Sequence, residues 1–129
     1  MAAQTILVVE DEFLIRFMLA DSLREVGYRI LEAANGVEAL DILRSGQTVD
    51  LMVTDVRMPG EVDGLELMRR SKSLAPSRPV IICSAHLFEQ DVHPADAFLA
   101  KPYSIAALAD IIARLIGDPW TNDSQTRSA

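Results

Sequence analysis

The sequence has almost no cysteine, few aromatic residues and fewer basic residues than acids. Cys83 is the one cysteine among 129 residues, and aromatic residues make up 5%. A single cysteine excludes an intrachain disulfide and a cysteine metal cluster, as expected in a reducing cytoplasm. The 19 acids exceed the 12 Lys and Arg residues, and the net charge is −7. Such a charge disfavours binding to the phosphate backbone of nucleic acid.

The sequence also lacks a basic leader and a long apolar run. Its first residues, "MAAQTILVVEDE", reach acids before any long apolar stretch, so no secretory signal peptide is expected. No run approaches the roughly 18 apolar residues that a membrane span needs. We therefore expect a cytoplasmic protein without a membrane attachment. The length suits one domain with one core.

Short apolar runs alternate with helical patterns, which predicts an α/β fold with a parallel sheet covered by helices on both faces. The predicted strands are residues 5–9, 28–33, 51–54, 79–83 and 97–100. The predicted helices are 13–26, 36–43, 64–73 and a last one that Ser104 caps and Gly117 ends. Residues 85–96 contain Pro94 and are expected to form one turn or an irregular loop. We assign residues 1–117 to one domain and 118–129 to a polar tail.

Polar and charged residues follow the ends of four predicted strands. Glu10 and Asp11 follow the first strand, Asp55 the third, Ser84 the fourth and Lys101 the fifth. In an open α/β sheet the ligand crevice lies beyond the carboxyl ends of the strands. These side chains should therefore converge at one edge of the sheet, although they are distant in sequence.

Converging carboxylates repel one another, and a divalent cation removes that repulsion. Oxygen ligands without His or Cys suit Mg²⁺ better than Zn²⁺. Beside such a metal, the Asp55 carboxylate can attack a phosphoryl group and become an acyl phosphate. Lys101 would then neutralise the transferred charge, and Ser84 would donate a hydrogen bond to a phosphoryl oxygen.

Four segments in this order resemble the receiver domain of two-component response regulators: "ILVVEDE", "LMVTDVRMPG" with "DGLELM", "PVIICSA" and "AFLAKPYS". The resemblance covers residues 5–116. It implies a flavodoxin-like, doubly wound sheet of five parallel strands in the order 2-1-3-4-5. It also implies that Asp55 accepts the phosphoryl group, and that Mg²⁺ is held by Glu10 through water, Asp11, Asp55 and the backbone carbonyl of Arg57.

The same resemblance assigns residues near the last two strands. Ser84 corresponds to the switch hydroxyl and Lys101 to the family's lysine, which a cis-proline, Pro102, follows. Phe98 corresponds to an aromatic switch residue, although packing in the core would equally explain an aromatic side chain in a short apolar strand.

The sequence departs from the family's common pattern in three places. The loop "MPGEVDG" has one extra residue, and Ser84 replaces the commoner Thr. The spacing from Ser84 to Lys101 is about five residues shorter than usual, so the fourth helix is expected to be short or absent and the readout through Phe98 is less certain than phosphate capture.

The predicted first helix has more apolar residues than one buried stripe requires. The stripe predicted to face the core consists of Ile15, Met18, Leu19, Leu23 and Val26. Three others, Phe13, Leu14 and Phe17, fall largely outside it and beside the acids, where they would suit docking of a helical phosphodonor. A deeper position of the helix, or pairing of two copies in an otherwise monomeric or weakly dimeric protein, would also explain them.

We interpret the chain as a stand-alone phosphoacceptor that receives a phosphoryl group from a histidine kinase or histidine phosphotransfer protein. It would signal to an unknown downstream protein and turn over no external substrate, so we do not expect a conventional enzyme. A phosphatase of the haloacid dehalogenase type would want a second acid two residues after Asp55, where Arg57 stands. A phosphate sink or scaffold without output, or a receiver fragment of a larger regulator or hybrid kinase, remain alternatives.

Overall fold

The computed structural model describes residues 3–85 and 95–119, within which five strands form one sheet. The strands are β1 (Thr5–Val9), β2 (Arg29–Ala33), β3 (Leu51–Asp55), β4 (Val80–Ser84) and β5 (Ala97–Ala100). The order is β2-β1-β3-β4-β5, and all four neighbouring pairs are parallel. The predicted flavodoxin-like, doubly wound sheet is therefore confirmed.

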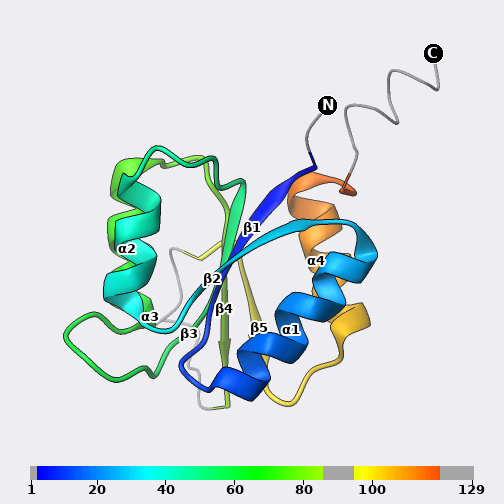
Figure 1. Ribbon diagram of the computed structural model, residues 1–129, viewed down its shortest axis with the longest axis horizontal. Helices are drawn as coiled ribbons and strands as arrows, with labels where there is room; N and C mark the ends of the chain where they lie inside the picture. The colour runs from blue at the N-terminus through cyan, green and yellow to red at the C-terminus, as the bar shows by residue number, and fades with distance from the viewer. Residues whose placement is uncertain (1–2, 86–94, 120–129) are drawn as a thin grey trace.

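Helices cover both faces of this sheet (Figure 1). One face carries α1 (Phe13–Val26) and α4 (Ile105–Ile116), and the other carries α2 (Gly36–Arg44) and α3 (Gly64–Leu74). The helix α4 follows β5. The helix expected to be short or absent falls in residues 86–94, outside the described residues. None of the described helices has the length and apolar character to span a membrane.

The two faces of the sheet bury alternate side chains of each strand. Ile6 and Val8 of β1 contact the layer under α1 and α4, whereas Leu7 and Val9 contact the layer under α2 and α3. Every residue of β1, β3 and β4 is buried, because helices cover both sides of these central strands. Two apolar layers thus fix the position of each strand end.

Side chains cap three of the four helices at their amino ends. The predicted caps Asn35 and Ser104 are confirmed: their side-chain oxygens accept hydrogen bonds from the backbone N–H groups of Glu38 (2.9 Å) and Ala107 (3.0 Å). Asp63 caps α3 in the same way. These bonds satisfy backbone donors that would otherwise lack a partner in the first helical turn.

The buried face of α1 is narrower than the sequence predicts. Leu19 and Leu23 are buried as expected, but Ile15, Met18 and Val26 are 41%, 66% and 47% exposed, so their predicted place in the core is wrong. The small side chain of Ala20, which is fully buried, lets the helix approach the sheet through a thin stripe. The remaining apolar residues of the helix face outward.

The loop between β3 and α3 is packed onto the core although it has an extra residue. Met58 and Val62 are buried in the layer under α2 and α3. At the end of the loop, Gly64 lies directly against Asp55: a Cβ atom on Gly64 would overlap the Asp55 carbonyl oxygen. The Gly64 N–H group also donates a hydrogen bond of 2.8 Å to the carbonyl of Val56. Helix α3 thus supports the backbone at the end of β3.

Replacement of Gly64 by Ala tests this support. The added methyl group must displace the Asp55 backbone or α3, so we expect a loss of roughly 1–3 kcal/mol in the free energy of unfolding. Ala otherwise favours a helix over Gly, so a loss has no propensity explanation. The exposed Ser73→Ala on the same helix is the control and should change stability by less than about 0.5 kcal/mol. Urea unfolding measures both, and equal stability of Gly64→Ala and wild type would contradict the contact.

Candidate functional site

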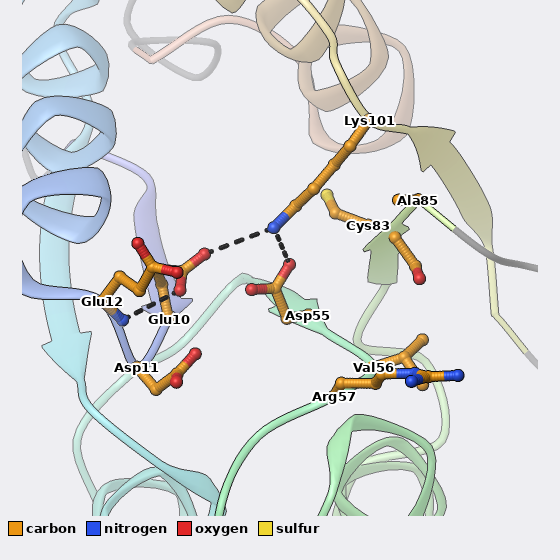
Figure 2. Close-up of a pocket in the computed structure, with 10 residues that line it drawn as sticks. Glu10, Asp11, Glu12, Asp55, Val56, Arg57, Cys83, Ala85 and Lys101 are labelled. Carbon is orange, nitrogen blue, oxygen red and sulfur yellow. Dashed lines mark hydrogen bonds and ion pairs between the residues drawn. The ribbon is translucent and has the colours of Figure 1, made fainter.

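The predicted site residues meet in one pocket at the carboxyl edge of the sheet (Figure 2). Asp55 is the last residue of β3 and Ser84 the last of β4, and both are 9% exposed. Glu10 follows β1 and is buried, whereas Asp11 beside it is exposed. The pocket is lined by Glu10, Asp11, Glu12, Asp55, Val56, Arg57, Cys83, Ser84, Ala85 and Lys101. The topology thus joins residues that the chain separates by up to 91 positions, from 10 to 101.

Lys101 reaches from the end of β5 to the acids of the two central strands, as Figure 2 shows. Its Nζ atom lies 2.7 Å from Oδ1 of Asp55 and 3.5 Å from Oε1 of Glu10. Burial by itself lowers the pKa of the Lys101 ammonium, but the hydrogen bond and charge of Asp55, with the charge of Glu10, outweigh it and raise the pKa. Lys101 therefore stays cationic in the pocket.

The acids themselves hold protons more tightly than usual. The pKa of Glu10 is raised, first by burial and then by its hydrogen bond with Asp55. The pKa of Asp11 is raised by desolvation and by its hydrogen bond with Glu10. The Glu10 side chain is oriented by the backbone N–H of Glu12, which donates to Oε2 at 3.0 Å. One ammonium group thus leaves negative charge in the pocket only partly compensated, which favours an added cation.

The arrangement of oxygen atoms fits a divalent cation. One carboxylate oxygen from each of Glu10, Asp11 and Asp55 lies within 4.8 Å of the other two. A set of oxygen donors without nitrogen or sulfur suits a hard cation such as Mg²⁺. Arg57 also lines the pocket, but its side chain points away from the acids in Figure 2, so only its backbone is suited to serve as a ligand.

The two residues assigned to a switch lie on different surfaces. Ser84 lines the pocket, and its backbone carbonyl accepts a hydrogen bond of 3.1 Å from the N–H of Lys101. The Lys101–Pro102 peptide bond is cis, as the resemblance predicts. Phe98 pairs with Ile82 in the sheet but is 41% exposed, so packing in the core, the alternative explanation of Phe98, is wrong.

The aromatic residues at the start of α1 lie on the surface beside the pocket. Phe13, Leu14 and Phe17 are 63%, 69% and 49% exposed, so the alternative of a deeper helix is wrong. The Phe13 and Phe17 rings stack at 6.2 Å between centroids. An apolar groove adjoins them, and it extends from Ile15 and Met18 of α1 to Lys101, Pro102, Tyr103 and Ile105.

Three neighbours of the site escaped the sequence analysis. Cys83 lines the pocket, and burial raises its pKa to about 12, so its thiol stays protonated and unreactive. Gly64 supports Asp55, and Arg16 binds the carbonyl of Glu10 at 2.8 Å. Each of the last two acts through backbone contacts that residue type and spacing do not indicate. Only the position of Arg16 one turn after the acids was available as a signal.

Comparison with known proteins places this arrangement in a family. The model of the response regulator receiver domain matches residues 6–113. Sporulation initiation phosphotransferase F of Bacillus subtilis is 32% identical over 121 residues, which cover 90% of this chain and 96% of that protein. Sensor kinase CckA of Brucella abortus is 40% identical over 119 residues, which cover 87% of this chain but only 12% of that protein.

A solved structure gives the same result. The response regulator protein TrrA of Thermotoga maritima, determined in complex with Mg²⁺ and BeF, superposes with a TM-score of 0.79 at 33% identity. The match covers 87% of this chain and 98% of that one. With the family model spanning most of the sequence, and the acids and lysine gathered at the expected edge of the sheet, the chain belongs to the response regulator receiver domain family.

Proposed function

We propose that Asp55 accepts a phosphoryl group from a histidine kinase or histidine phosphotransfer protein, with Mg²⁺ held by Asp11, Asp55, the backbone carbonyl of Arg57 and, through water, Glu10. The observation that carries the proposal is the pairing of one carboxylate with two kinds of partner. Asp55 lies within the group of three acids and at the same time contacts Lys101 at 2.7 Å. A nucleophile for phosphoryl transfer needs both arrangements.

The residues around Asp55 have distinct tasks in this reaction. A carboxylate oxygen of Asp55 attacks phosphorus as the P–N bond of the donor phosphohistidine breaks, which leaves an acyl phosphate on Asp55 and a free histidine on the donor. Lys101 neutralises charge on the phosphoryl oxygens, and the Ser84 hydroxyl donates a hydrogen bond to one of them. Bound Mg²⁺ supplies the positive charge that lets an anionic donor approach the acids.

Phosphorylation would act as a signal through Ser84 and Phe98. The burial of Ser84 in the pocket and the exposure of Phe98 support a route from the phosphoryl group to a surface that a downstream protein reads. The domain would turn over no external substrate, and its place would be the cytoplasm. A phosphate sink without output shares the same acceptor chemistry and differs only in this last step.

The outward face of α1 is the proposed docking site for the phosphodonor. The stacked Phe13 and Phe17 rings adjoin Leu14 and the groove that runs to Tyr103, next to Lys101. A helix that carries a phosphohistidine could bury its apolar side chains there while the histidine faces Asp55. The position of this apolar surface beside the pocket supports the proposal.

Phosphorylation by a small donor tests the acceptor. With acetyl phosphate and Mg²⁺, wild-type protein should gain the mass of one phosphoryl group, because the pocket itself supplies the catalytic groups. Asp55→Asn should gain none, since it lacks the nucleophile, and chelation of Mg²⁺ should abolish labelling of wild type. Intact-mass spectrometry reads all three. Equal labelling of wild type and Asp55→Asn would remove the proposal.

Phe17→Asp tests docking separately from chemistry. A charge in the apolar patch should slow transfer from a phosphorylated kinase or phosphotransfer protein about tenfold or more, the effect of losing an interface anchor worth more than about 1.4 kcal/mol. Labelling by acetyl phosphate should be unchanged. Leu74→Asp, at a side chain 49% exposed on α3, is the matched control and should leave both rates unchanged. Equal loss with both donors in Phe17→Asp would refute docking.

A further inference from the structure

Arg16 joins the surface of α1 to the backbone of the acidic site. Its Nη1 atom donates a hydrogen bond of 2.8 Å to the backbone carbonyl of Glu10. The Arg16 side chain is only 15% exposed, although it belongs to the first turns of a helix whose neighbouring residues face outward. The guanidinium group therefore lies along the turn that connects β1 to α1, which carries Glu10 and Asp11.

Two further groups fix the orientation of the guanidinium. Its Nε atom lies 3.4 Å from Oε1 of Glu32 on β2, and its carbon lies 5.5 Å from the centre of the Phe13 ring. The planar guanidinium is suited to such a set of contacts, since it presents donors in a fixed fork and stacks on aromatic faces. Arg16 is thus held by the sheet and by α1 while it binds the turn.

The turn has few other restraints at this point. The N–H group of Glu10 donates to the carbonyl of Ala33 at 3.1 Å, which continues the pairing of β1 with β2 by one residue. The carbonyl of Glu10 points the other way, to Arg16. With its N–H bound by the sheet and its C=O bound by Arg16, the peptide that precedes Asp11 is fixed on both sides.

We propose that Arg16 is a positioning residue for metal binding: through the carbonyl of Glu10 it holds Glu10 and Asp11 in the geometry that a divalent cation requires. The inference rests on the proposed function of the pocket. A preorganised turn saves the cost of ordering two acids against their mutual repulsion when the cation binds. Outer partners of this kind typically contribute about 10–100-fold to metal affinity.

Arg24 separates this role from a purely structural one. Its Nη2 atom contacts the same Glu32 at 3.1 Å and the carbonyl of Ile30 at 3.2 Å, so it also links α1 to β2. The printed contacts of Arg24 do not include the β1–α1 turn. A variant at Arg24 should therefore weaken the link between helix and sheet without loosening the acids.

The experiment compares Mg²⁺ affinity, measured by isothermal titration with the metal alone, in wild type, Arg16→Met, Arg16→Lys and Arg24→Met. Arg16→Met should bind Mg²⁺ about tenfold more weakly, the low end for an outer partner. Arg16→Lys should recover part of the affinity, because an ammonium can still donate to the Glu10 carbonyl. Arg24→Met should match wild type, and thermal unfolding without Mg²⁺ should show comparable losses for Arg16→Met and Arg24→Met.

Equal Mg²⁺ affinity in wild type and Arg16→Met, or equal losses in Arg16→Met and Arg24→Met, would overturn the inference and leave the proposed function intact. If Arg16→Met does not fold, Arg16→Lys against Arg24→Lys carries the same comparison, with a weaker affinity expected only for Arg16→Lys. Wild type that binds no Mg²⁺ would instead overturn the proposed function, and the inference with it.

Discussion

The contact between Lys101 and the acids of the two central strands is the interaction on which the site depends. Parallel strands that end at one edge force Glu10 and Asp55 together, and Asp11 adds a third carboxylate. Unit charges 4 Å apart interact by about 4 kcal/mol at an effective dielectric constant of 20, so this repulsion is large on the scale of folding stability. Lys101 offsets part of it, and the raised pKa values of Glu10 and Asp11 show the part that remains. That remainder is what a bound cation relieves.

The fold holds this charged edge in place by packing from below and from the sides. Fully apolar strands fix the ends of β1 and β3 between two core layers. The glycine at the start of α3 lets that helix rest on the backbone of Asp55, and the buried Met58 and Val62 anchor the intervening loop. The extra residue in this loop is therefore accommodated without freeing Asp55. On the other side, Arg16 and Glu32 brace the turn that carries Glu10.

Residue patterns predicted the elements well but not every contact between them. Strand and helix bounds follow from apolar runs and from caps such as Asn35 and Ser104, because these signals are local. The strand order came from the resemblance, since no periodicity encodes it. The helical period of Ile15, Met18 and Val26 was right but their burial was wrong, because the width of a buried stripe depends on how closely the helix approaches the sheet. Gly64 and Arg16 act on backbone atoms of distant or preceding residues, a role that residue type alone does not reveal.

The central claim is that three acids and one lysine form a pocket that binds Mg²⁺ and places a phosphoryl group on Asp55. A crystal structure of the protein with Mg²⁺ and beryllofluoride tests this most directly, because beryllofluoride mimics a phosphoryl group on a carboxylate. The account predicts beryllium bonded to an oxygen of Asp55, a fluorine within hydrogen-bonding distance of Lys101 Nζ, and Mg²⁺ bound by Asp11 and Asp55. Beryllofluoride bound elsewhere, or Mg²⁺ located away from these acids, would contradict it.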